Sequence, residues 1–206
     1  SQAARNGQDG VSLVQTAEGA LAEATSSLSR MRELAIAAAN GTLNSQDRTT
    51  LDAEFQALLS EVDRIAETTV FNGVNLLNTN AGSVTIQIGT ELGDTIVLDL
   101  ADATDGGLGL TGASFDITTV SNATASLATI DAAIDSIAGI RGDLGAAQNR
   151  LESAIRSIQN SEENLAAAES RIRDVDVARE TADLTRNTIL QQAAISILAQ
   201  ANAQPQ

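Results

Sequence analysis

A seven-residue repeat of large apolar side chains dominates the C-terminal part of the chain. Its members are Ile130, Ile137, Leu144, Leu151, Ile158, Leu165 and Ile172, followed three residues later by Ala133, Ile140, Ala147, Ala154, Ser161, Ala168 and Val175. This pattern is typical of a long α-helix that packs lengthwise against other helices. Burial of each large side chain contributes on the order of 1.5–3 kcal/mol, so we expect this seam to be covered.

The N-terminal part predicts two further helices. The first carries a second seam, formed by Val14, Ala17, Leu21, Ala24, Leu28, Met31, Ala35 and Ala38, and it ends at the helix-terminating pair Asn40-Gly41. The second helix begins after N-cap candidates around Asn44. One face of it carries Leu51, Phe55, Leu58, Val62 and Ile65. The turn at 71–73 follows it. We predict that these two helices cover the C-terminal seam.

The middle of the chain has a different pattern. Residues 83–88 alternate between polar and apolar side chains, residues 94–100 do so more loosely, and the Gly-containing linker 89–93 joins them. This predicts a β-hairpin, which we expect to lie on the helices because an isolated hairpin is marginal in water. We divide the chain into N-terminal helices (1–77), a hairpin and loop (78–125) and a long C-terminal helix (126–206). The fold expected is mainly α, an elongated antiparallel coiled-coil-like bundle with a small β-hairpin region.

Charge and composition exclude several classes of function. The net charge of −15 disfavours binding to nucleic acid and to anionic membrane surfaces. We find no run of about 18 apolar residues and expect no membrane insertion. The chain has no His and no Cys, which removes the common metal sites and nucleophile–base pairs. We therefore expect no enzyme, cofactor or metal site, and we interpret Asp174 and Asp176 as part of a solvated helix face.

Three short motifs have ordinary interpretations. The tripeptide Arg141-Gly142-Asp143 resembles an integrin-binding motif but falls inside the predicted long helix, and Asn122-Ala123-Thr124 is a glycosylation sequon by pattern alone. Glycines at 139, 142 and 145 weaken a helix by roughly 1 kcal/mol each relative to alanine. They indicate either a close approach of a neighbouring chain or a flexible start, and the sequence leaves both open.

Several blocks along the chain together resemble bacterial flagellin. The N-terminal blocks are 2–6, 9–10, 15–21, 32–35 and 70–73, and the central ones are 85–89 and 94–96. The C-terminal blocks are 144–146, 148–151, 170–174, 189–193 and 198–202. They follow the family order and leave only about 101–129 unconstrained. The resemblance implies a secreted, extracellular subunit of the flagellar filament that polymerises with other flagellin subunits after delivery by an export chaperone and the type III export apparatus.

The resemblance also predicts where this chain departs from the family. In flagellins the terminal segments form the inner tube of the filament, and a variable insertion decorates the outside. Here we expect both terminal segments to be missing and the insertion to be nearly absent, since a few dozen residues join the hairpin to the last helix.

One binding site is implied by the resemblance. Flagellins are recognised by a vertebrate innate immune receptor through the first helices, and the matching positions are Arg30, Leu34 and Glu54. Arg30 and Leu34 are four residues apart and would share one helix face. The alternative is that Leu34 packs against the second helix while Arg30 pairs with solvent or a carboxylate.

Two other functions remain as alternatives. A hook–filament junction protein shares the terminal helical patterns of flagellin, and the ability to form long homopolymers distinguishes the two. An extracellular glycan-binding adhesin could use the acidic loop around Asp99, Asp102 and Asp105, although aromatic stacking residues are scarce in this chain.

Overall fold

The computed structural model describes residues 1–206 except 90, 92, 113–114, 174–176 and 204–206. The chain forms two compact units, Ser1–Gln159 and Asn160–Gln206, which are described separately below. The predicted acidic pair at 174 and 176 and the last seam position at 175 lie outside the described residues. The division into segments 1–77, 78–125 and 126–206 stays a prediction.

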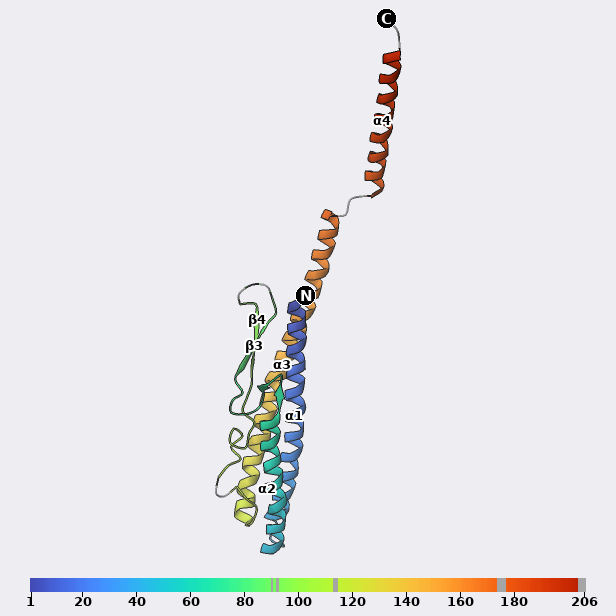
Figure 1. The fold of residues 1–206 in the computed structure, drawn as a ribbon. Coiled ribbons are helices and arrows are strands. Elements are labelled where there is room, and N and C mark those ends of the chain that lie inside the picture. Colours follow the sequence, from blue (N-terminus) through green and yellow to red (C-terminus); the bar gives the residue numbers. More distant parts are fainter. Residues whose placement is uncertain (90, 92, 113–114, 174–176, 204–206) are drawn as a thin grey trace. The chain divides into compact units, whose positions relative to one another are not determined.

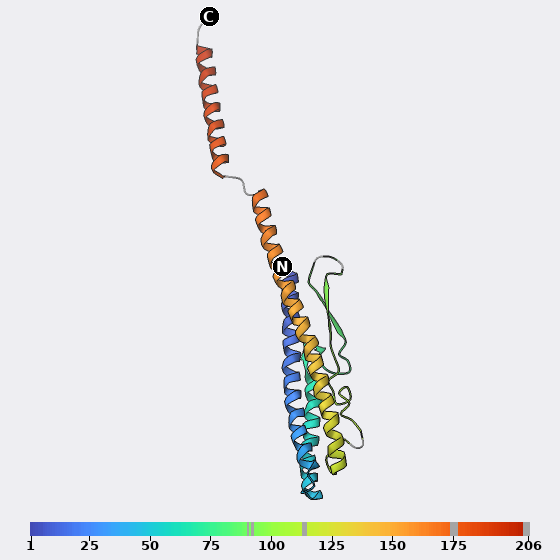
Figure 2. The same ribbon diagram turned by 180° about the vertical axis from the view of Figure 1, so that it is seen from behind.

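The first unit is built on three helices that lie side by side in both views of the ribbon (Figures 1 and 2). They are α1 (Gln2–Ala39), α2 (Ser45–Thr68) and the part of α3 (Val120–Arg173) up to residue 159. Arg32 of α1 pairs with Asp131 of α3, whereas Gly10 lies against Leu151. Residue numbers thus fall along α1 as they rise along α3, which confirms the predicted antiparallel packing.

The predicted seams form the core of this unit. Side chains of all three helices are buried in one cluster, which includes Val14, Leu21, Leu28, Met31, Phe55, Val62, Ile130, Ile137, Leu144 and Leu151. By length and composition alone α3 could cross a membrane. The seam residues of α3 are buried in the core cluster, so its apolar side chains serve the packing of the first unit. The absence of membrane insertion stays a prediction.

The expectation that the N-terminal helices cover the whole C-terminal seam is wrong for its last part. Leu165 is 69% exposed and Ile172 is 87% exposed, and both belong to the second unit. The antiparallel register explains this, because Gly7 near the start of α1 already lies beside Ile155. Only residues 2–6 of α1 precede this contact, which is less than two helical turns.

The predicted hairpin is confirmed. Strands β3 (Ser83–Gln87) and β4 (Thr95–Asp99) pair antiparallel, with Ser83 opposite Asp99 and Gln87 opposite Thr95. The hairpin lies on α1, where the Asn6 side-chain amide donates a hydrogen bond of 2.9 Å to the Gln87 carbonyl. A second, smaller hairpin, formed by β1 (Val70–Phe71) and β2 (Val74–Asn75), was not expected. It confirms a turn within the predicted 71–73, although Phe71 lies in β1 and the turn itself is Asn72-Gly73.

The corner between α1 and α2 is held by polar contacts. Asn44 caps α2, since its side chain accepts from the Asp47 amide while the Asp47 side chain accepts from the Asn44 amide. Arg48 lies one turn into α2 and is only 9% exposed. Its Nε donates to the Ala38 carbonyl and its Nη2 to the Asn40 carbonyl, both at 2.9 Å, which satisfies carbonyls at the end of α1.

The start of α3 is organised by Asp116. One carboxylate oxygen accepts from the amide and hydroxyl of Thr118, and the other accepts from the Asn122 side-chain amide at 2.9 Å. Burial acts to raise the pKa of Asp116, but these hydrogen bonds outweigh it and the pKa is lowered. The sequon nitrogen of Asn122 is therefore engaged in the fold, which supports the interpretation of the sequon as a chance pattern.

The other two motifs of α3 also lie inside the helix. Arg141 of the integrin-like tripeptide points towards Glu18 of α1, with 3.4 Å between Nη2 and Oε1, so the tripeptide forms no loop tip. A methyl group added at Gly139, Gly142 or Gly145 would meet no atom within 4 Å. These glycines are not required by close packing within the described chain, and the contact with a neighbouring chain remains a hypothesis.

Two glycines of α1 make a matched test of the close approach between α1 and α3. A Cβ at Gly7 would lie 2.8 Å from Cγ1 of Ile155, whereas one at Gly19 meets nothing within 4 Å. We expect Gly19→Ala to raise the free energy of unfolding by about 1 kcal/mol through helix propensity. Gly7→Ala should lower it by roughly 1 kcal/mol, because overpacking outweighs that gain. Chemical denaturation of both variants measures the difference, and equal stabilisation would contradict the packing described.

Two aspartates of this unit have pKa values shifted in opposite directions. Partial burial, reinforced by the negative charge of Asp105, raises the pKa of Asp63 on α2. The lowered pKa of Asp116 means that its contribution to stability is present above the pKa of the unfolded chain and is lost as pH falls through the folded value. For Asp63 the sign is reversed, so stability decreases as pH rises through the ordinary pKa towards the raised one.

We expect Asp116→Asn to lower the free energy of unfolding at pH 7 by roughly 1 kcal/mol, because charge-assisted hydrogen bonds are lost. Asp63→Asn should raise stability at pH 7, because a disfavoured charge is removed. Thermal melts from neutral to strongly acidic pH test both effects. Each difference from the unmodified chain should vanish in acid, where the native carboxyl groups are protonated, and differences that persist there would show another cause.

Candidate recognition surface on the first two helices

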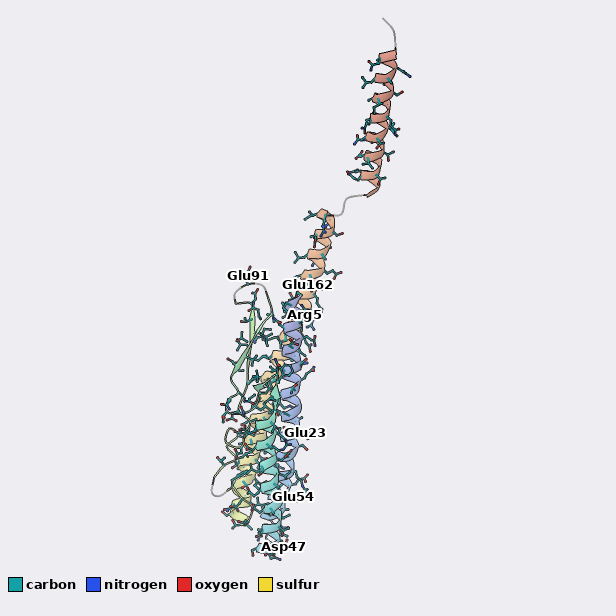
Figure 3. All side chains as sticks on the ribbon, in the orientation of Figure 1. Arg5, Glu23, Asp47, Glu54, Glu91 and Glu162 are labelled. Carbon is teal, nitrogen blue, oxygen red and sulfur yellow. The ribbon has the colours of Figure 1, made fainter. Side chains whose placement is uncertain are left out.

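Arg30 of α1 and Glu54 of α2 meet across the surface of the first unit. The Arg30 guanidinium donates from Nε to Glu54 Oε1 at 2.9 Å, and its Nη2 lies 2.8 Å from the same oxygen. Nη1 donates to Oε2 of Glu33, one turn further along α1, at 2.9 Å. Glu54 is labelled in Figure 3, in the lower part of the bundle. The structure therefore brings together two of the three predicted site residues.

The helix repeat explains why these charges lie outside. Positions 28, 31, 34 and 35 of α1 face the core, so Arg30 and Glu33 fall on the solvent side. The hydrogen bond with Glu33, followed by that with Glu54, raises the pKa of Arg30 and keeps it charged. Both partners of Arg30 are about half exposed or more, so these pairs contribute little to stability and are available to a partner.

Leu34 does not join this surface. Its side chain is 3% exposed and belongs to the buried cluster. This placement agrees with the alternative given above, in which Leu34 packs inside the bundle while Arg30 pairs with a carboxylate. The exposed large apolar side chain among the described residues of α1 is Ile36, which follows Glu33 by one turn.

A second ion pair, which the sequence did not predict, joins α1 to α3. Arg32 donates from Nε to Asp131 Oδ1 of α3 at 2.7 Å, and this hydrogen bond raises the pKa of Arg32. The two residues are 99 positions apart. Local spacing gives no signal for such a pair, which only the register of α1 against α3 creates.

The second unit has an exposed apolar surface on α4. Helix α4 (Val177–Ala203) confirms the helical spacing of apolar residues near the C-terminus. Its large apolar side chains lie 59–67% exposed at Leu184, Ile189, Leu190, Ile195, Ile197 and Leu198. Such a concentration of exposed apolar side chains on one helix is typical of a surface that binds another protein. The described residues of the chain contain no group of three or more metal-ligating side chains.

Comparison with known proteins covers both ends of the chain. Residues 1–81 match the bacterial flagellin N-terminal helical region, and residues 127–206 match the bacterial flagellin C-terminal helical region. A flagellin of Halalkalibacterium halodurans is 48% identical over 205 residues, an alignment that spans all of this chain and 75% of the relative.

Solved structures show the same arrangement. The crystal structure of Bacillus cereus flagellin is 35% identical, with a TM-score of 0.68 over 80% of this chain and 94% of that one. A structure of a putative flagellar hook-associated protein from Vibrio parahaemolyticus also reaches a TM-score of 0.68, but at 16% identity it shows the fold alone. The sequence matches at both ends and the shared fold show that this chain belongs to the bacterial flagellin family and is a structural subunit of the flagellar filament.

Proposed function

We propose that copies of this chain pack into the filament through the exposed apolar side chains of the second unit. The observation that carries the proposal is the exposure of large side chains along α4, together with Leu165 and Ile172 at the end of α3. These residues continue the apolar pattern that is buried in the first unit. A neighbouring subunit can supply the cover that this chain does not supply itself.

The physical argument rests on the contrast between α1 and α4. Helix α1 has a continuous buried face, whereas α4 has no buried side chain among its described residues. An isolated helix in water is stabilised only weakly, and most helical stability comes from packing of its apolar face. Packing of α4 between subunits would stabilise helix and polymer together, and an open helical arrangement of subunits produces a filament.

Polymerisation of the chain tests this proposal. We expect long tubular filaments in negative-stain electron micrographs when the chain carries the flagellin terminal segments of its relatives. Replacing Leu190 and Leu198 by Asp in that protein should abolish filaments, because charges would be buried without partners. The melting temperature of the first unit should not change, since these side chains lie in the second.

A matched control replaces two exposed polar residues of the same helix, Gln191 and Gln192, by Ala, and it should leave filaments intact. Filaments from the Asp variant would exclude the apolar side chains as the assembly surface. Short caps in place of long filaments from the unsubstituted protein would favour a hook–filament junction protein, and glycan binding without any polymer would favour the adhesin.

We infer that the subunit acts outside the cell, after passage through the flagellar export apparatus with a chaperone. Membership of the flagellin family supports this, as does the exposed apolar surface of α4, which needs cover before assembly. We also infer that the chain has no enzymatic activity, because flagellins are structural proteins and because the chain has no His and no Cys.

We also propose that an innate immune receptor of vertebrates binds the surface around Arg30 and Glu54. Support comes from the family resemblance of these positions and from their exposed, charged pairing across α1 and α2. Leu34 would act indirectly, by holding α1 in place from the core.

Receptor signalling by purified variants separates these roles. Arg30→Ala should reduce signalling several-fold with little change in stability, because Arg30 is exposed. Arg64→Ala is the matched control, since Arg64 forms a similar exposed pair with Glu61 within α2. Leu34→Ala should lower the free energy of unfolding by about 2–5 kcal/mol, as expected for a leucine removed from a core.

Equal signalling by the Arg30 and Arg64 variants would remove Arg30 from the binding surface. A loss of signalling by the Leu34 variant without a loss of stability would show that Leu34 contacts the receptor directly.

A further inference from the structure

Three Asn-Gly pairs occur at Asn6, Asn40 and Asn72, in three different environments. In such a pair the glycine amide nitrogen can attack the asparagine side-chain carbonyl, because glycine has no Cβ to hinder the approach. The reaction requires rotation about the asparagine backbone and a glycine N–H that is not held elsewhere. The fold therefore decides which pair reacts.

Asn6 is held on three sides. It lies in α1, where the amide of Gly7 belongs to the helical hydrogen-bond pattern. Its side-chain nitrogen donates to the Gln87 carbonyl at 2.9 Å, and its side-chain oxygen accepts from Gln2 at 3.0 Å. Attack on this carbonyl would require opening of the helix and detachment of the hairpin.

Asn72 is held by the small hairpin. Asn72 and Gly73 form a two-residue turn with φ values of 49° and 81°. The flanking residues are paired, with Phe71 opposite Val74 and Val70 opposite Asn75. Rotation of the backbone at Asn72 would break these strand pairs, so the turn resists the reaction.

Asn40 lies between α1 and α2, outside the helices and the hairpins. It ends α1 in an extended conformation with φ −71° and ψ 126°, and both it and Gly41 are exposed. No hydrogen bond described for this corner uses the Gly41 amide as donor. Rotation would break two long contacts, 3.2 Å from the Thr42 amide to the Asn40 side chain and 3.4 Å from the Leu43 amide to its carbonyl. It would also break the 2.9 Å hydrogen bond that the same carbonyl accepts from Nη2 of Arg48.

A nearby asparagine gives an internal comparison. Asn44 is also exposed, but its side chain accepts from the Asp47 amide at 2.9 Å in the capping box of α2. The residue that follows it is Ser45, whose side chain hinders the approach of the amide. Exposure alone therefore does not distinguish Asn40, and the free glycine amide does.

We propose that Asn40 is a site of spontaneous deamidation in the folded protein. The Gly41 nitrogen forms a bond with Cγ of Asn40, loses its proton and expels the side-chain nitrogen as ammonia, which closes a cyclic imide. Water then adds to one of the two imide carbonyls and opens the ring. The products are aspartate and isoaspartate, and the second carries the backbone through the former side chain.

The modification acts on the corner between α1 and α2. The Asn40 carbonyl accepts from Nη2 of Arg48, so the additional backbone atom of isoaspartate displaces the acceptor of a nearly buried guanidinium. Both products also place a negative charge at the C-terminus of α1, where the helix dipole disfavours it. The consequence is a slow, irreversible loosening of the first unit as the subunit ages.

Mass spectrometry of the aged chain tests the proposal. We would incubate the folded chain at mildly alkaline pH, digest it with trypsin and follow the peptide Glu33–Arg48, which contains both Asn40 and Asn44. We expect the mass gain of an amide-to-acid exchange first at Asn40, before Asn6, Asn44 or Asn72. The melting temperature of the aged sample should fall in parallel.

Gly41→Ala is the matched variant. An added Cβ at Gly41 meets nothing within 4 Å and its φ is not positive, so the variant should fold normally. It should slow the gain at Asn40 several-fold and leave the other sites unchanged. The proposal is overturned if Asn40 stays intact in the folded chain while it reacts in urea, if another asparagine reacts first, or if the Ala variant ages at the original rate.

Discussion

Burial of the apolar seam between α1, α2 and α3 is the interaction on which the rest of the first unit depends. Large side chains such as Leu21, Leu28, Ile130 and Ile137 are withdrawn from water only when the helices lie side by side along their length. This packing brings Gly7 and Gly10 against side chains of α3. Gly10 also lies against Ile86, so the same close approach provides the place where the hairpin rests on α1.

Polar contacts then select one register from those that a repeating apolar seam allows. A seven-residue repeat can pack in several registers, since a shift by one repeat restores similar contacts. The pair Arg32–Asp131 matches at one register only, because a shift of one repeat would place Thr124 or Ala138 opposite Arg32, although the pair is exposed and weak. Arg48 has a stronger role at the corner, because its nearly buried guanidinium requires the last carbonyls of α1 as acceptors.

The two units differ in where their apolar side chains find cover, and this difference links the structure to the filament. The apolar seam of the first unit is buried within one chain, whereas the large apolar side chains of the second unit are exposed. A filament subunit needs both properties, a body that is stable alone and a surface that is stable only in the polymer. Changes at the corner of α1 and α2, such as the ageing proposed for Asn40, therefore act on the body and leave the assembly surface chemically unchanged.

Periodicity in the sequence was sufficient to predict the helices, their antiparallel packing and the hairpin of β3 and β4, because spacing along the chain reflects local backbone geometry. The turn residues at 71–73 predicted the turn. The family resemblance grouped Arg30, Leu34 and Glu54, and the sequence left open whether Leu34 is exposed with Arg30 or packed inside the bundle. Only the tertiary structure decided that Leu34 faces the core, that Arg32 meets Asp131 and that the seam loses its cover after Leu151 and Ile155. These features depend on the register between helices distant in the sequence, and a repeating pattern of similar side chains does not encode that register locally.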